Sequence, residues 1–209
     1  MWAILFCMEV LEEFVQVRPD DLWIYNKLQI SRKLGYNCGP IGAPVPWPGE
    51  YIIRPVMNFL GMGRNARKID LNPTDLTENY AHPGEFWCEY FTGEHISVDF
   101  VHKKPVLVVT GEKESTKSSI EESRWTIWRK IDRVVAFPPF LEQISEEYPT
   151  INVEMIGGNV IEVHLRGNPD FVWGNTVAIP VYDDEELHPP EGFTYIESPD
   201  YTRKGFYIN

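Results

Sequence analysis

Hydrophobic and polar residues alternate along several stretches of the chain, and these stretches predict strands. Residues 95–101 read HISVDFV, with the period of two that is typical of a strand. Residues 151–156 and 159–165 form a second such region, on either side of Gly157-Gly158, a two-residue turn of the kind that hairpins prefer. This region predicts a β-hairpin. Short β-branched and aromatic runs predict further strands at 51–53, 86–91, 106–110 and 176–181.

Helices are predicted for longer segments that begin with acidic residues or end at a glycine. Asp20-Asp21 caps a helix over 22–34, which Gly35 ends. Two more helices are expected over 123–135 and 140–148. Residues 3–17 fit either a buried strand or a helix, since the period of a short apolar run does not separate the two.

The segments between these elements are expected to be loops. Residues 35–50 contain four Pro and four Gly, with room for an extended piece at 43–46. The polar span 69–85 is the candidate for a mobile lid or a connection. Residues 111–119 are rich in Ser, Lys and Glu, and residues 183–201 are acidic and Pro-rich, which predicts an extended tail.

Composition narrows the class of protein. The chain has 209 residues and a net charge of −12, which weighs against wrapping duplex nucleic acid, because phosphate contacts supply most of that affinity. Its three cysteines are widely spaced and form no CxxC pair, which argues against a disulfide framework and a zinc site. We read neither a signal peptide nor a membrane span, so a cytoplasmic protein is expected.

The stretch Tyr51–Ala66 has chemistry suited to phosphate. Arg54 places a fixed cation at the end of a predicted strand, and the glycine-rich loop Gly61-Met62-Gly63 follows. Glycines let backbone N–H groups approach an anion, and basic side chains neutralise it. The alternative is a strand followed by an ordinary turn with solvated basic residues.

The predicted hairpin carries a group of charged residues. Alternation places Glu162 and His164 on one face, and a symmetric pairing across the turn sets Glu154 opposite about residue 161. Clustered carboxylates repel each other unless a cation lies between them, and Mg²⁺ prefers oxygen ligands. Arg166 could reach a phosphate on the same face. The alternatives are a solvated charged face and, for His164, a hydrogen-bonded side chain of the hairpin.

In order along the chain, these features resemble the motifs of the ATP-grasp superfamily. The resemblance covers about residues 20–170 and implies an α+β fold, in which two α+β subdomains with antiparallel sheets enclose a nucleotide cleft. Members of this superfamily mostly activate a carboxylate as an acyl phosphate and join it to an amine or thiol. The matching motifs are Asn26-Lys27, Ile53-Arg54-Pro55, the glycine loop, Glu89–Asp99, Asn152–Glu154 and Val160–Arg166.

The resemblance implies a role for each matching residue. Lys27 and Arg54 would bind the phosphates of ATP, and Gly61, Met62 and Gly63 would close over them. Glu154, Glu162 and His164 would hold Mg²⁺, and Arg166 would join Arg54 in catalysis. The residues implied for adenine and ribose are Glu89, Tyr90, Phe91, Glu94 and His95.

Three positions depart from the superfamily pattern. Arg54 stands where Lys is usual. Arginine keeps the positive charge of lysine but binds phosphate through two N–H donors, whereas lysine acts as a point charge. His95 stands where a ribose-binding Glu is usual, so either Glu94 takes that role or the ribose contact differs. His164 stands where an Asn usually binds the second Mg²⁺, and imidazole is a poorer ligand for that ion. The site would then prefer another metal, hold one metal, or have lost activity.

The resemblance also implies a division of the chain. Residues 1–19 would be an N-terminal element, 20–170 an ATP-grasp-like domain with a small lobe at about 35–85, and 171–209 an irregular acidic tail. The usual N-terminal substrate domain would be missing or reduced, which hints at a bulky or macromolecular acceptor.

Two functions follow, in different classes. The first is an ATP- and Mg²⁺-dependent ligase that joins a carboxylate to an amine. The second is a nucleotide-binding or inactive relic with an assembly role, for example a viral component, acting as a homo-oligomer or with a partner subunit. A third hypothesis is a nucleic-acid acceptor, because basic and aromatic residues mix on the predicted helix 123–135; an amphipathic core helix is the favoured alternative.

Overall fold

The computed structural model describes residues 17–57, 66–113, 124–200 and 203–209. Within these ranges the chain forms short helices and two antiparallel sheets, so the expected α+β class with two sheets is confirmed. The glycine loop Gly61-Met62-Gly63 and most of the predicted N-terminal element 1–19 lie outside the described residues. No helix in these ranges has both the length and the apolar character needed to cross a membrane.

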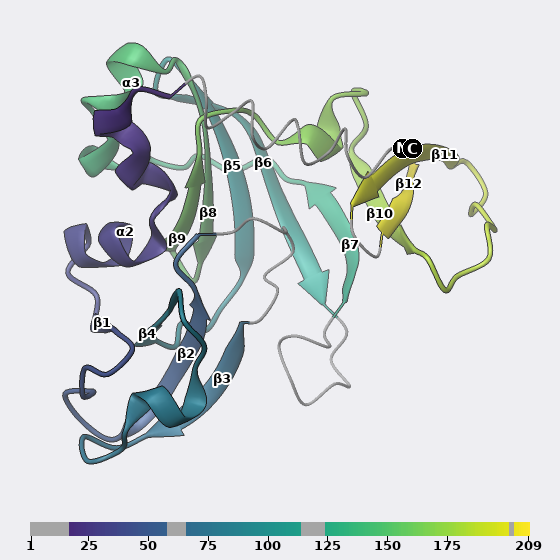
Figure 1. Ribbon diagram of the computed structural model, residues 1–209. Coiled ribbons are helices and arrows are strands. Elements are labelled where there is room, and N and C mark those ends of the chain that lie inside the picture. The colour runs from purple at the N-terminus through teal and green to yellow at the C-terminus, as the bar shows by residue number, and fades with distance from the viewer. Residues whose placement is uncertain (1–16, 58–65, 114–123, 201–202) are drawn as a thin grey trace.

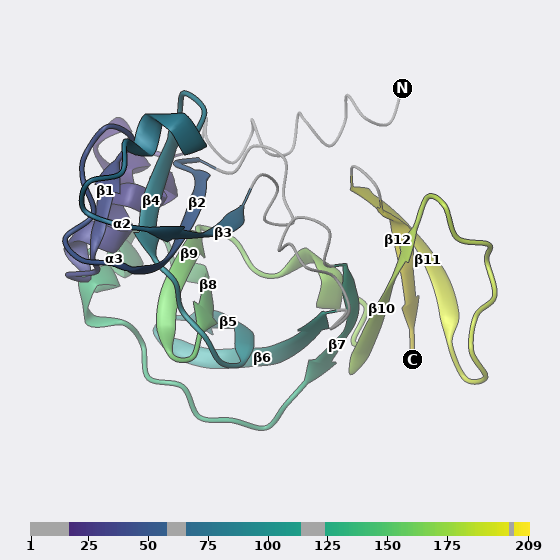
Figure 2. The ribbon, with the colours of Figure 1, turned by 90° about the horizontal axis from the view of Figure 1, so that it is seen from below.

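The large sheet contains eight strands in the described part of the chain, in the order β11-β12-β10-β7-β6-β5-β8-β9. Figure 2 shows it as one curved layer that runs across the molecule. Its strands are β5 (His95–Val101), β6 (Lys104–Lys113), β7 (Trp125–Lys130), β8 (Thr150–Ile156), β9 (Asn159–His164), β10 (Val177–Tyr182), β11 (Thr194–Asp200) and β12 (Arg203–Ile208).

The small sheet lies beside the β8–β9 end of the large sheet (Figures 1 and 2). Its order is β1-β4-β2-β3, with β1 (Cys38–Pro40), β2 (Gly49–Pro55), β3 (Arg67–Leu71) and β4 (Glu85–Glu89). Helix α2 (Lys27–Lys33) contacts both β1 and β9. The helix therefore joins the two sheets.

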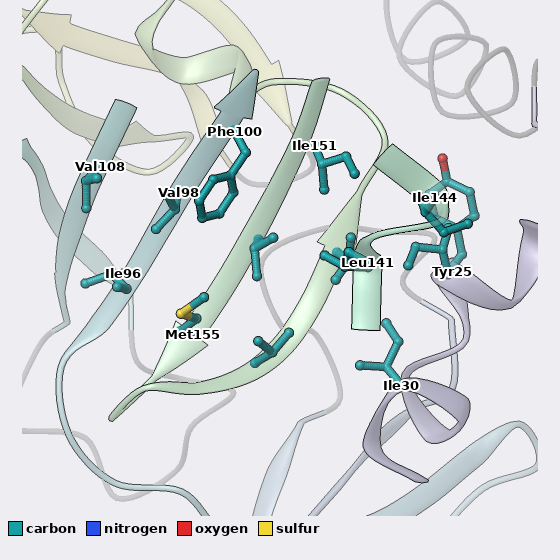
Figure 3. Close-up of a cluster of buried hydrophobic side chains, with 14 of the residues drawn as sticks. Tyr25, Ile30, Ile96, Val98, Phe100, Val108, Leu141, Ile144, Ile151 and Met155 are labelled. Carbon is teal, nitrogen blue, oxygen red and sulfur yellow. The ribbon is translucent and has the colours of Figure 1, made fainter. Parts of the chain in front are cut away.

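One face of the large sheet carries the main hydrophobic core. Alternation along β5 buries Ile96, Val98 and Phe100, while β8 adds Ile151, Val153 and Met155. These side chains share one cluster with Leu141 of the 3-10 helix η3 (Pro139–Leu141), Ile144 of α3 (Ile144–Glu147), Tyr25 and Ile30, and Figure 3 shows part of this cluster. Each such burial contributes roughly 1.5–3 kcal/mol. Because this face is used for packing, the polar side chains of the same strands lie on the opposite face.

The predicted hairpin is confirmed as β8 and β9. Gly157 and Gly158 have φ values of 56° and 84°, which suit a two-residue hairpin turn. A β-carbon on Gly157 would meet the carbonyl oxygen of Thr92 at 2.2 Å. A register shift between Glu154 and Met155 corrects the expected pairing by one residue, so Glu154 lies directly opposite Glu162.

The helix predicted over 123–135 is wrong, because residues 125–130 form the strand β7. Trp125 and Trp128 are three residues apart, a spacing that also occurs on one face of a helix. In the structure, Glu112 pairs with Ile127 and Lys113 with Trp125, so a bulge at Thr126 brings both indoles to one face of a strand. Trp, Thr and Ile favour strands, and β6 and β10 pair with β7 on its two sides.

The other predicted helices are shorter than expected. The segment 22–34 is divided at Asn26 into a 3-10 helix, η1 (Pro19–Tyr25), and α2. The Asn26 side chain accepts a hydrogen bond from the backbone N–H of Gln29 at 2.9 Å, so Asn26 begins a new helix. The segment 140–148 likewise contains η3 and α3 in place of one helix.

Two segments that were expected to be loops contain regular structure. The loop 35–50 includes β1 and the start of β2, and the polar span 69–85 begins inside β3 and contains the 3-10 helix η2 (Thr77–Tyr80). Thr77 is buried, and its hydroxyl accepts a hydrogen bond from the Gly42 N–H at 2.7 Å. This hydrogen bond holds the segment 69–85, the candidate for a lid or a connection, against the segment 35–50.

The irregular tail expected over 171–209 is also corrected. Its strands β10, β11 and β12 extend the large sheet, and Phe206 and Ile208 are buried in a second cluster with Val109 and Phe171. The tail has a weak strand pattern because Pro180 and Pro199 interrupt it. The domain boundary at residue 170 stays a prediction.

Candidate functional site

The polar face of the large sheet brings together side chains from three neighbouring strands. His95 and Ser97 alternate along β5, and Ser97 lies opposite Glu154 on β8. Glu154 lies opposite Glu162 on β9, and His164 follows two residues later on the same face. The sequence pattern therefore placed these acids together correctly.

Lys27 connects this face to helix α2. Its Nζ lies 2.9 Å from Glu162 Oε2, and only 5% of the residue is exposed. The Lys27 backbone N–H donates to the carbonyl of Val56, just after β2, at 2.9 Å. Burial lowers the pKa of Lys27, and the charge of Glu162 opposes that shift. One residue thus links α2, the small sheet and the acidic pair.

Arg54 supplies a second buried cation from β2 of the small sheet. It is 7% exposed, and its Nε has no hydrogen-bond partner among the described residues. Its guanidinium carbon lies 5.3 Å from the ring centre of Phe86. Burial lowers the pKa of Arg54, while the charges of Glu162 and Glu154 act to raise it. Arg54 and the hairpin acids therefore lie within electrostatic range of each other.

The two acids are held in their ionised forms. Burial would raise the pKa of Glu154, but the hydrogen bond and charge of His95 outweigh it and lower the pKa to about 2. His95 Nε2 lies 3.1 Å from Glu154 Oε2. Burial would likewise raise the pKa of Glu162, yet the charges of Lys27 and His164 lower it. His164 Nε2 is 3.5 Å from Glu162 Oε1.

These ion pairs bear on the predicted Mg²⁺ site. No three His, Cys, Asp or Glu side chains in the described ranges are arranged to hold a metal ion. Protein side chains already lie beside both acids, Lys27 beside Glu162 and the His95 imidazole beside Glu154. The ionised oxygens of Glu154 and Glu162 fit Mg²⁺ as a ligand pair, whereas the third predicted ligand, His164, is engaged with Glu162.

The residues predicted for adenine and ribose do not form one group. Glu89 accepts hydrogen bonds from the N–H and side-chain amide of Asn37, at 3.1 and 3.0 Å. Glu94 pairs with Arg133 at 2.6 Å and lines a cavity of about 580 Å³ with Ile96, Met155 and Val160, residues of the apolar face. Tyr90 contacts Lys68 at 4.7 Å, and Phe91 contacts Tyr36 at 4.7 Å. His95, the fifth residue of this set, contacts Glu154.

The predicted catalytic residue Arg166 is exposed, just beyond β9. Its Nη1 donates to the carbonyl of Gly167 at 3.0 Å. The charge of Arg166 acts on Asp99, which shares a face of the sheet with His164, and on Asp170. Its role in catalysis stays a prediction.

A buried polar network beside the acids was missed from the sequence. Asn152 donates to Ser97 Oγ and Asp99 Oδ1, each at 2.7 Å. The N–H of Asn168 donates to both oxygens of Asp99, at 3.0 and 2.9 Å. The alternation in HISVDFV placed Ser97 and Asp99 on the face of His95, and that signal could have identified them.

Comparisons with known proteins give matches among solved structures. No family model matches the chain, and no curated protein matches it. The ATP-grasp ligase PsnB in complex with a minimal precursor is 15% identical, with a TM-score of 0.40 over 71% of this chain and 53% of that one. An L-amino acid ligase from Bacillus licheniformis is 13% identical, with a TM-score of 0.44 over 72% and 42%. A D-alanine–D-alanine ligase from Bacillus anthracis is 14% identical, with a TM-score of 0.35 over 68% and 56%.

The chain spans roughly half the length of these solved chains. All three are described as ligases, and PsnB as an ATP-grasp ligase. Structures of PsnB have also been solved with Mg and ADP and with AMPPNP.

Proposed function

We propose that the junction of the two sheets binds the phosphates of ATP together with Mg²⁺. On this basis the protein is a ligase that activates a carboxylate as an acyl phosphate and joins it to an amine. The observation that carries the proposal is Arg54, a buried guanidinium whose Nε lacks a partner among the described residues. A buried charge without a complete set of partners is costly, and an anionic ligand would supply them.

The surrounding residues support the same ligand. Arg54 and Lys27 come from different elements and act on the same pair of acids. An arginine fork grips phosphate at two points, and a lysine adds a point charge. Together they would neutralise the charge that a transferred phosphoryl group carries.

Glu154 and Glu162 are the residues that would hold Mg²⁺. When bound, the ion would neutralise phosphate oxygens. Lys27 lies beside Glu162 and the His95 imidazole beside Glu154, and these contacts lower the pKa of both carboxyl groups. Transfer of a phosphoryl group to a carboxylate requires no protein nucleophile, which agrees with the residues at the junction.

Calorimetric titration with ATP and MgCl₂ tests the phosphate site. We expect Arg54→Met to weaken binding about a hundredfold, because a charge-assisted bidentate contact is lost. Arg32→Met is the matched control, since Arg32 is an exposed arginine on α2. Equal affinity in the wild type and in Arg54→Met would contradict the proposal.

Turnover requires a second measurement. Hydroxylamine traps acyl phosphates, so a panel of organic acids with ATP, Mg²⁺ and hydroxylamine should give a hydroxamate with the correct donor. Glu162→Gln should abolish the signal, because the variant loses one ionised ligand. A hydroxamate yield unchanged by Glu162→Gln would count against a role for this acid.

One observation favours a second candidate, a nucleotide-binding protein without turnover that acts in assembly. Glu154 and Glu162 already contact protein side chains, His95 and Lys27, and the described residues offer no group of three metal ligands. ATP that binds with wild-type dependence on Arg54, but gives no hydroxamate with any acid, would favour this candidate.

A further inference from the structure

Two tryptophans form an aromatic wall on the polar face of the large sheet. The ring centres of Trp125 and Trp128 are 4.3 Å apart, and the two rings are inclined by 38°. Both residues are half-buried. The bulge at Thr126 makes this arrangement possible, since a regular strand would direct residues three apart to opposite faces.

Gly111 on β6 provides the space that the wall occupies. It pairs with Trp128, and a β-carbon at this position would meet the ring of Trp125 at 2.6 Å and that of Trp128 at 2.7 Å. A glycine inside a strand often marks a place of close approach. Here the two indoles lie directly over the strand backbone.

The wall adjoins the candidate phosphate site through His95. The imidazole meets Trp125 edge-on, with ring centres 4.8 Å apart, and Trp128 at 5.6 Å. The same imidazole contacts Glu154 at 3.1 Å. The indoles and the phosphate-site acids are therefore separated by a single side chain.

Lys113 adds a cation to the wall. Its Nζ lies 4.5 Å from the ring centre of Trp125, and within the described residues it has no carboxylate at ion-pair distance. Burial lowers the pKa of Lys113, and the charge of Glu154 opposes the shift. The nearby arginines differ, because each is paired: Arg124 with Asp184 at 2.8 Å, Arg129 with Glu112 at 3.7 Å and Arg133 with Glu94 at 2.6 Å.

These pairings decide between two kinds of ligand. A single-stranded nucleic acid needs a row of available cations along its backbone as well as stacking surfaces. Around β7 the three described arginines are each paired with a carboxylate, whereas the ammonium of Lys113 lies against the aromatic wall. That combination suits a small molecule with one anionic group and an apolar body.

We propose that Trp125, Trp128 and Lys113 form a subsite for an organic acid with an aromatic or bulky apolar body, in which Lys113 binds the carboxylate and the indoles contact the body. The assignment of this acid as the donor of the ligase rests on the proposed function.

Titration with phenylacetate, without nucleotide, tests the subsite. The readout is the set of indole N–H signals in proton–nitrogen correlation spectra of the full chain, with Trp125→Phe and Trp128→Phe used to assign two of the seven tryptophans. We expect both signals to shift, with a dissociation constant of about a millimolar. Phenylacetamide, which has the ring but no charge, should bind about tenfold more weakly.

Variants of Lys113 separate charge from packing. Lys113→Met keeps the apolar stem and should weaken phenylacetate binding about tenfold, whereas Lys113→Arg should retain it. Lys104→Met is the control, because Lys104 is exposed at the other end of β6. Unchanged binding in Lys113→Met, or equal binding of phenylacetamide, would overturn the subsite.

Further outcomes separate this inference from the proposed function. Phenylacetate binding that depends on Lys113 would support the subsite even in a protein that fails to bind ATP. Normal ATP binding without any shift from phenylacetate would overturn the subsite alone. Larger shifts of these indoles with inorganic phosphate or an oligothymidylate than with phenylacetate would also overturn it.

Discussion

Two buried arginines lie at opposite ends of the structure, and they differ in their counter-charges. Arg203 on β12 is 9% exposed, and its guanidinium nitrogens contact both oxygens of Asp170 at 3.4 Å. Arg54 on β2 is 7% exposed, and no carboxylate in the described ranges lies at ion-pair distance from it. The two arginines are buried to a similar extent, but in the described ranges only Arg203 has a carboxylate close enough to offset the cost of burying its charge.

The difference indicates different roles. Arg203 and Asp170 form an ion pair within one region, where Arg203 also stacks on Phe206 at 4.0 Å, so a carboxylate of the protein itself balances the charge of Arg203. Arg54 belongs to the small sheet, and the acids that act on it belong to the large sheet. Under the proposed function, Arg54 contributes to ligand binding more than to folding.

The largest expected effect is on stability at the paired end. Arg203→Met should lower the free energy of unfolding by about 3 kcal/mol, because Asp170 would be left buried without its partner. Urea denaturation at pH 7 measures this change. The double variant Asp170→Asn/Arg203→Met should recover part of the loss, since neither charge then remains. A loss below about 1 kcal/mol in the single variant would show that the pair is not structural.

The sequence correctly predicted those elements whose local hydrophobic pattern agrees with their strand pairing in the structure. The strand 95–101 and the hairpin 150–164 were predictable from alternation and from Gly157-Gly158, and the hairpin brought Glu154 and Glu162 together. The one-residue shift in their pairing was not predictable, because a bulge leaves no clear mark in the sequence. Lys27 was placed on a helix correctly, although Asn26 begins that helix later than the pattern indicated.

The sequence did not predict those features that depend on tertiary contacts. The spacing of Trp125 and Trp128 fits a helix face and a bulged strand equally, and only pairing with β6 and β10 selects the strand. The place of Arg54 near the end of a strand was expected from the sequence, but the partners of the acids, His95 and Lys27, depend on contacts across 59 and more residues. Such contacts are invisible to local periodicity.

The next prediction concerns the stability of the protein and the packing of Trp125 and Trp128 over Gly111. Gly111→Ala should destabilise the protein by about 1–3 kcal/mol, because its β-carbon would overlap both tryptophan rings. Gly49→Ala is a suitable control, since its β-carbon would meet only the Tyr51 ring, at 3.9 Å. Equal stability of the two variants, measured by urea denaturation, would contradict the packing of the wall over β6.

Acid titration probes the carboxylates at the Arg54 end. The pKa of Glu154 is about 2 in the folded protein, below the ordinary value of 4.5, so its stabilising contribution is complete above pH 4.5. The contribution, on the order of 1 kcal/mol for a partly exposed group, should be lost as the pH falls from 4.5 towards 2.

Glu154→Gln removes this titrating group. The difference in unfolding free energy between the wild type and Glu154→Gln should be constant above pH 4.5 and shrink towards zero near pH 2. Denaturation curves collected at half-unit intervals measure it. A difference that stays constant down to pH 2 would mean that Glu154 has no depressed pKa in the folded protein.

The smallest expected change in stability is at Arg54 itself, and it sharpens the contrast with Arg203. Arg54→Met should alter the free energy of unfolding by less than about 1 kcal/mol, because Glu162 keeps Lys27 as its partner and no carboxylate loses its only cation.

Under the proposed function, ATP with Mg²⁺ at about 100 times its dissociation constant should add about 2.7 kcal/mol to the stability of the wild type and of Arg203→Met. The same nucleotide should add little to Arg54→Met. If Arg54→Met instead costs as much as Arg203→Met without ligand, Arg54 is a structural residue, and the contrast between the two buried arginines disappears.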